Sequence, residues 1–158
     1  MPVINRIAEF SDEMAGWRQH IHAHPETAFE EHKTAAFVAE KLRSFGINVH
    51  TGLARTGVVG TLEGHHGKGP SIGLRADMDA LDIEEKNTCD HASKYPGKMH
   101  ACGHDGHTAM LLGAAKYLAE TRNFSGTVQF IFQPAEEFAG GGREMVEDGL
   151  FDRFPVET

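Results

Sequence analysis

The stretch from His100 to Thr108, with the sequence HACGHDGHT, places a Cys, three His and an Asp within nine residues. Thiolate, imidazole and carboxylate groups are the ligands that zinc-like divalent ions select, and three protein ligands plus a water make a catalytic site. Cys102 and His104 are two residues apart, and in an extended loop both can bend toward one ion because Gly103 gives the backbone freedom. A His-rich loop before a helix is also common as polar surface, so this stretch alone favours neither a metal site nor a polar surface.

Two further groups of carboxylates follow predicted strands. Asp77 and Asp79 come after the run SIGLRA, and Glu136 and Glu137 come after the run TVQFIF. Ligands of open α/β sheets bind beyond the carboxyl ends of the strands, so these groups and the HACGHD loop are expected to converge. Neighbouring residues of an extended segment face opposite ways, so one Glu can bind a metal while the other handles a proton. Taken singly, the Glu pair also suits a solvated face, and the two Asp suit loop anchors.

The other residues that could do chemistry carry weaker indications. His20 and His24 are four residues apart in HIHAHPE, which suits a metal, but three His at a helix end are more often surface or supporting groups. Cys89 is interpreted as a free thiol. The sequence contains no H-E-x-x-H, P-loop or C-x-x-C motif, and it lacks the pattern of the zinc nucleobase deaminases.

The elements that must position these residues show helical and strand patterns in turn. Apolar residues at helical spacing predict helices, and short apolar runs predict strands, with TVQFIF typical of a strand covered on both faces. Ser11 is the expected N-cap of the first helix. The pattern predicts an α/β fold, a three-layer αβα sandwich in one domain. The predicted helices span residues 11–23, 29–46, 108–120 and 143–149, and the predicted strands span 47–51, 57–64, 71–76 and 127–132.

Composition and charge argue against several classes of protein. The chain has 158 residues and a net charge of -8, and an acidic chain without a Lys/Arg run argues against nucleic acid as a partner. Its apolar runs are too short to span a bilayer, and its start lacks the pattern of a secretory signal. With only two Cys and no expected membrane partner, we expect a reduced, cytoplasmic chain.

Five segments occur in an order that resembles one family. They are HPETAFEEHKTA, GLRADMDALDIEE, MHACGHDGHTAMLLGAA, FQPAEE and GGGREMVEDGLF. Together they resemble the metal-dependent amidohydrolases that include hippurate hydrolases, N-acyl-L-amino-acid amidohydrolases and plant auxin-amino-acid hydrolases, within the larger aminoacylase and carboxypeptidase family. The resemblance runs from about Trp17 to Phe151, and CGHDGHT together with PAEE is its most specific part.

The resemblance implies a role for each matching residue. Cys102, His104 and Glu137 correspond to metal ligands, and the implied cofactor is a divalent metal, Mn²⁺ or Zn²⁺. Glu136 corresponds to the general base, which takes a proton from the attacking water and passes it to the leaving amine. Asp77 corresponds to the acidic residue that supports the site from the strand end.

Two departures from the family affect the site. Arg75 stands where wider relatives carry a metal-binding His, so the number of ions, one or two, stays open. Family members are more than twice as long, with a lid domain and two further His ligands. By this resemblance, residues 1–158 are the N-terminal part of a zinc-peptidase-like catalytic domain. Such a part is expected to be inactive and prone to self-association alone, and the full-length protein is expected to form homo-oligomers.

The implied reaction is hydrolysis of the amide bond of N-acyl amino acids, small molecules such as hippurate. Two alternatives stay open: a peptidase or a deacetylase of a related biosynthetic intermediate, and a non-catalytic module in which the metal serves structure. Glu136 favours an enzyme, because a structural metal site needs no free base beside it.

Overall fold

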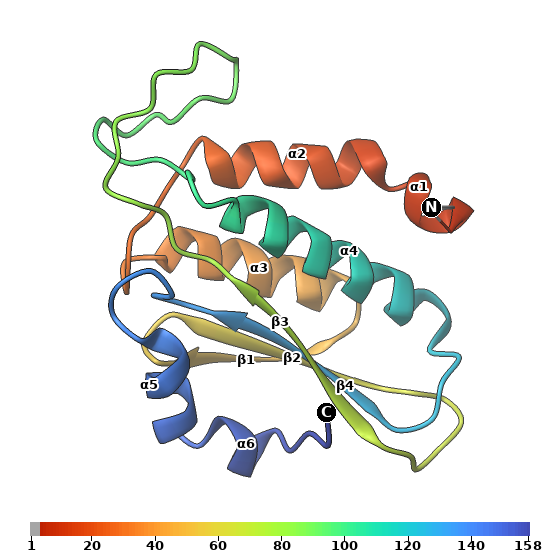
Figure 1. The fold of residues 1–158 in the computed structure, drawn as a ribbon. Helices are drawn as coiled ribbons and strands as arrows, with labels where there is room; N and C mark the ends of the chain where they lie inside the picture. Colours follow the sequence, from red (N-terminus) through yellow and green to blue (C-terminus); the bar gives the residue numbers. More distant parts are fainter. Residues whose placement is uncertain (1–3) are drawn as a thin grey trace.

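Residues 4–158 are described by the computed structural model (Figure 1). Two antiparallel strand pairings and one parallel pairing join all four strands into a mixed sheet in the order β1-β2-β4-β3. The helices are α1 (Asn5–Ala8), α2 (Ser11–His22), α3 (His32–Ser44), α4 (His104–Thr121), α5 (Gly141–Glu147) and α6 (Leu150–Arg153), and the strands are β1 (Asn48–Leu53), β2 (Gly57–Glu63), β3 (Ser71–Asp77) and β4 (Thr127–Gln133).

The two parallel strands, β3 and β4, decide where a ligand can bind. They are joined by a crossover through α4, the connection that parallel neighbours require. In their register Asp77 pairs with Gln133, the last residue of each strand, so both strands finish at the same edge of the sheet. The convergence expected for the segments that follow these strands is therefore built into the topology.

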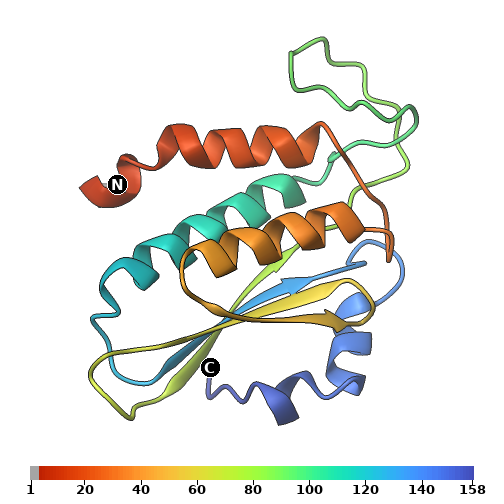
Figure 2. The ribbon, with the colours of Figure 1, turned by 180° about the vertical axis from the view of Figure 1, so that it is seen from behind.

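Helices lie against both faces of this sheet (Figure 1). α3 and α4 cover one face, and α2 packs on the outer side of α4, as the view from behind also shows (Figure 2). The short helices α5 and α6 lie on the opposite face (Figure 2). The fold is thus α/β with a mixed four-stranded sheet between helices.

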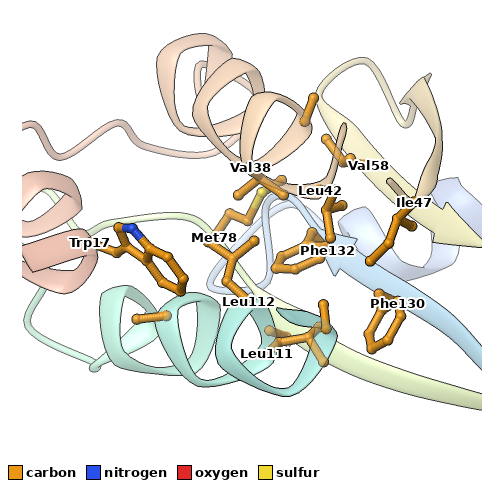
Figure 3. Close-up of a cluster of buried hydrophobic side chains, with 14 of the residues drawn as sticks. Trp17, Val38, Leu42, Ile47, Val58, Met78, Leu111, Leu112, Phe130 and Phe132 are labelled. Carbon is orange, nitrogen blue, oxygen red and sulfur yellow. The ribbon is translucent and has the colours of Figure 1, made fainter. Parts of the chain in front are cut away.

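The hydrophobic core lies between the sheet and α3 and α4 (Figure 3). β4 is buried on both faces, as its continuous apolar run predicts: Phe130 and Phe132 join the main core, whereas Ile131 faces a smaller cluster with Met145 of α5. Among residues 4–158, no helix is both long enough and apolar enough to cross a membrane. The main core includes Trp17, Val38, Leu42, Val58, Met78, Leu112, Phe130 and Phe132.

The predicted N-cap of α2 and the predicted start of α4 are wrong. Ser11 is the first residue of α2 and not its N-cap, which is Phe10, and no side chain caps this end. α4 begins at His104, four residues before the predicted start, so His104 belongs to a helix and not to an extended loop. Gly103 explains the early start, because it holds a φ of 91°, a left-handed conformation that glycine adopts without strain.

Candidate metal centre

Three segments meet where β3 and β4 end. The end of β3 carries Asp77, the segment after β4 carries the two Glu residues, and the start of α4 carries His104, with Cys102 just before it. One ligand atom from each of Cys102, His104 and Glu137 lies within 4.8 Å of the others. The structure therefore brings together the three residues for which the sequence predicts a ligand role.

The side chains of this group have the free atoms that a metal would need. Nε2 of His104 lies 3.7 Å from Oε1 of Glu137. That carboxylate oxygen is buried and has no hydrogen-bond partner, which is costly for a buried polar atom unless something else satisfies it. Thiol, imidazole and carboxylate form a donor set that suits a zinc-like divalent ion, so the residues fit such a group.

Asp79 orients two members of this group. Nδ1 of His104 lies 3.1 Å from Oδ1 of Asp79 and 3.0 Å from its carbonyl oxygen, so Nδ1 carries the proton and Nε2 keeps its lone pair. The other oxygen, Oδ2, accepts the backbone N–H of Glu137 at 3.0 Å. A carboxylate behind a ligating His is the common way to fix its ring. The sequence placed Asp79 near the site but gave it no role beyond a loop anchor.

The two Glu residues differ in exposure rather than in direction. Oε2 of Glu136 lies 4.0 Å from Nε2 of His104, about as close as Glu137, yet 42% of the Glu136 side chain is exposed against 18% for Glu137. The expectation that they face opposite ways is wrong, because the segment is not extended. Ala135 has a φ of 52°, and this left-handed residue bends the chain just before the pair. Its N–H donates to Oε1 of buried Glu31 at 2.8 Å, which holds the bend.

Asp77 lies beside His104, and it also contacts His107, to which the sequence assigned no role. Its Oδ2 accepts a hydrogen bond from Nη1 of Arg75 at 2.7 Å. Its Oδ1 lies 2.7 Å from Nδ1 of His107 and 3.6 Å from Nε2 of His104. Asp77, His104 and His107 form a second group with ligand atoms within 4.8 Å of one another. Had α4 been predicted to start at His104, the spacing of three residues would have placed both His on one helix face.

The site has an excess of negative charge. The hydrogen bond with Glu137, then burial and the neighbouring carboxylates, raise the pKa of the Cys102 thiol to about 11. Burial acts to lower the pKa of His104, but its hydrogen bond to Asp79 and the charges of Asp77, Asp79 and Glu137 outweigh burial and raise it. Both shifts favour the protonated forms, and both would be reversed by a cation held among these groups.

A second layer of buried polar contacts holds the start of α4. Nδ1 of His22 lies 2.8 Å from Oδ2 of Asp105, and Nε2 of the same ring lies 3.2 Å from Oε1 of Glu85. Arg18 also donates to Oδ2 of Asp105, at 3.0 Å. These contacts tie α2 and the segment after β3 to the residue next to His104.

The remaining His and Cys residues named by the sequence lie outside both groups. His24 donates through Nδ1 to the carbonyl of His20 at 2.7 Å, a local contact within the end of α2. Cys89 is an exposed free thiol, as predicted. His100 is buried with neither ring nitrogen hydrogen-bonded, and burial lowers its pKa to about 4.

Comparisons with known sequences show which family the chain resembles. The family profile described as peptidase family M20/M25/M40 matches residues 73–158, which include both ligand groups. The chain is 52% identical over 155 residues to an N-acyl-L-amino acid amidohydrolase of Geobacillus stearothermophilus, covering 95% of this chain and 41% of that protein. It is 50% identical over 157 residues to a hippurate hydrolase of Campylobacter jejuni, covering 98% of this chain and 40% of that protein.

Solved structures contain the same fold. A dinuclear metal-binding peptidase from the M20 family of Bacillus subtilis is 41% identical, with a TM-score of 0.87 over 92% of this chain and 41% of that structure. In each of these comparisons the chain spans about two fifths of the relative's length.

Proposed function

The chain belongs to peptidase family M20/M25/M40, and from this membership we propose that it supplies the metal centre of an enzyme that hydrolyses the amide bond of N-acyl amino acids. One observation carries the proposal: Cys102, His104 and Glu137 lie together as a donor set, with the more exposed carboxylate of Glu136 beside them. Two relatives that match at 50% identity or more are an N-acyl-L-amino acid amidohydrolase and a hippurate hydrolase.

In this proposal Cys102, His104 and Glu137 hold a divalent metal, Mn²⁺ or Zn²⁺. A bound ion of this kind polarises the amide carbonyl and makes water more acidic. Arg75 occupies the position of a further metal-binding His, and its guanidinium donates to Asp77 and to Oε1 of Gln133. The chain itself thus offers one compact thiolate-containing set, and a two-ion centre like that of the Bacillus subtilis relative would need ligands from elsewhere.

Glu136 acts as general base and general acid in the proposed reaction. Its exposed carboxylate can accept a proton from the attacking water and return it to the departing nitrogen. Glu137, less exposed and hydrogen-bonded through its backbone to Asp79, is the better placed to remain a fixed ligand. Asp79 keeps the Nε2 lone pair of His104 directed at the centre, and Asp77 supports it from the end of β3.

The proposal makes residues 1–158 the N-terminal part of a three-layer catalytic domain. Because the chain spans about two fifths of its relatives, we expect the rest of the full-length protein to supply further ligands, the substrate pocket and the contacts of a homo-oligomer. The 158 residues alone are then expected to be inactive. A peptidase is the alternative favoured by the Bacillus subtilis relative, and it would use the same metal centre on a different amide.

A chimera tests the proposal in a complete protein. This chain replaces the matching N-terminal part of the Geobacillus stearothermophilus amidohydrolase, with which it shares 52% identity. The purified chimera is assayed on hippurate, N-acetyl amino acids and dipeptides, after metal removal and again after addition of Mn²⁺ or Zn²⁺. The 158-residue chain alone is assayed in parallel.

The proposal predicts metal-dependent release of amino acids from the N-acyl substrates by the chimera and none by the chain alone. Preference for dipeptides would replace it with the peptidase alternative. A folded chimera that binds metal without hydrolysing any of these amides would contradict it and would leave a non-catalytic metal module.

A further inference from the structure

His104 belongs to both ligand groups but has one nitrogen to offer. Asp79 holds Nδ1 through its carboxylate and its carbonyl oxygen, so Nε2 is the nitrogen available to an ion. Nε2 lies almost equally far from two carboxylates, 3.6 Å from Oδ1 of Asp77 and 3.7 Å from Oε1 of Glu137. An imidazole nitrogen has a single lone pair and serves one ion at a time.

The spacing on the Asp77 side suits coordination as well as the spacing on the Glu137 side. Ligand atoms at about 2.0–2.1 Å from a tetrahedral ion are about 3.3 Å from one another. Nδ1 of His107 is hydrogen-bonded to Oδ1 of Asp77 at 2.7 Å, and a cation between these two atoms would take the place of the shared proton; Nε2 of His104 lies 3.6 Å from the same oxygen, close to the spacing of two ligands. Arg75 pairs with the other carboxylate oxygen, Oδ2, and leaves Oδ1 to this group.

We propose that Asp77, His104 and His107 form a second divalent-cation site that overlaps the site of Cys102, His104 and Glu137 and excludes it. The inference rests on the proposed function, because it assumes that Cys102 and Glu137 also bind a metal. An ion in one site takes the Nε2 of His104 from the other, so the chain holds one ion and not two.

The two sites differ in chemistry, and each has one exposed ligand, Cys102 in one and His107 in the other. The Cys102 site contains a thiolate, which favours softer ions such as Zn²⁺, whereas the Asp77 site has only nitrogen and oxygen ligands, which also suit harder ions such as Mn²⁺. His107 is reached easily from solvent, since 47% of its side chain is exposed. The identity of the ion therefore decides which carboxylate shares it with His104.

Titration of the metal-free 158-residue chain with Co²⁺ separates the sites, because coordination by thiolate adds a sulfur-to-metal charge-transfer band in the near ultraviolet. The wild-type chain is expected to bind one Co²⁺ with this band. Cys102→Ser should lose the band and still bind one Co²⁺, and adding His107→Ala should weaken that binding by at least about tenfold. His104→Ala should abolish both modes. His66→Ala is the control: this exposed His bonds Asn123 at the opposite end of β3 and should change nothing.

Two results would overturn the inference: a wild-type stoichiometry of two Co²⁺ per chain, or unchanged affinity when His107→Ala is added to Cys102→Ser. Circular dichroism checks that each variant folds. The side chain of His107 is half-exposed, so we expect His107→Ala to leave the fold intact. The test also separates this inference from the proposed function. If the band appears in wild type but Cys102→Ser binds nothing, the second site fails and the proposed centre stands. If the band never appears while binding depends on His107, the proposed centre fails and the second site stands.

Discussion

Nδ1 of His104 lies 3.1 Å from Oδ1 of Asp79, and both side chains are almost completely buried. This contact fixes the tautomer of the ring, so Nε2 faces the carboxylates of the candidate centre. The carboxylate also has a favourable environment of its own. Burial acts to raise the pKa of Asp79, but the hydrogen bonds from His104 and from the backbone N–H groups of Glu137 and Glu136 outweigh it and lower the pKa.

Asp79→Ala should therefore weaken metal binding although Asp79 is not a ligand. Loss of such a supporting carboxylate typically costs about 10–100-fold in affinity. Competition with a chromophoric chelator measures the affinity for Zn²⁺ on the purified chain. Asp82→Ala, an exposed Asp three residues further on, is the control and should leave the affinity unchanged. Equal affinities for the two variants would contradict the orienting role of Asp79.

Glu31 predicts a pH dependence of stability. It is buried between Thr56 and Ala135, and burial raises its pKa above the ordinary value of 4.5. A carboxyl whose pKa is raised in the folded state is most favourable to folding below the unfolded value, and this contribution is lost as pH rises through the folded value. Glu31→Gln can still accept the N–H of Ala135, and its amide N–H can donate to the hydroxyl of Thr56 in place of accepting from it. The substitution removes the charge that burial disfavours, so it should raise Tm near pH 7 and leave Tm unchanged near pH 4.

Glu30, the exposed neighbour of Glu31, gives a matched control because its pKa is shifted in the opposite direction. The hydrogen bond from Lys98 lowers the pKa of Glu30, so its contribution is present above the unfolded pKa and is lost as pH falls. Glu30→Gln should lower Tm slightly near pH 7 and not at low pH. Thermal melts of both variants across this range check the two signs, and parallel shifts in both would refute the assignment for Glu31.

Truncating a side chain of α4 that packs in the core should lower the stability of the protein, whereas truncating an exposed side chain of the same helix should not. Leu112 is fully buried in the same cluster as Phe130 and Phe132, whereas Met110, two residues earlier on the same helix, is 58% exposed. Leu112→Ala should lower the free energy of unfolding by about 2–5 kcal/mol, because it removes apolar contact and leaves a cavity. Met110→Ala should change it by about 0.5 kcal/mol or less. Urea denaturation measures both, and similar costs would contradict the packing.

Sequence patterns could predict the parts of this molecule that depend on local order. The apolar run of β4 indicated a strand covered on both faces, and carboxylates after two strands indicated one edge of the sheet. Convergence of Cys102, His104 and Glu137 follows from the parallel pairing of β3 with β4, which the alternating pattern made reasonable to expect.

The missed features depend on backbone geometry or on distant contacts. The start of α4 depends on the left-handed conformation of Gly103, and this start decides that His107 shares a helix face with His104. The contact between His22 and Asp105 joins residues 83 positions apart, which no periodic pattern reveals. Similarly, the bend at Ala135 is held by Glu31 from another part of the chain. The directions of the Glu136 and Glu137 side chains therefore could not be predicted from the sequence around them.

The central claim is that Glu137 holds a metal while Glu136, its neighbour, moves a proton. Turnover and metal content of the chimera measured together in Glu136→Gln and Glu137→Gln test it most directly, because the two changes are chemically identical. We predict that Glu136→Gln keeps its metal and loses about 10²–10⁴-fold in turnover, whereas Glu137→Gln loses metal. Near-normal turnover in Glu136→Gln, or full metal content in Glu137→Gln, would contradict the account.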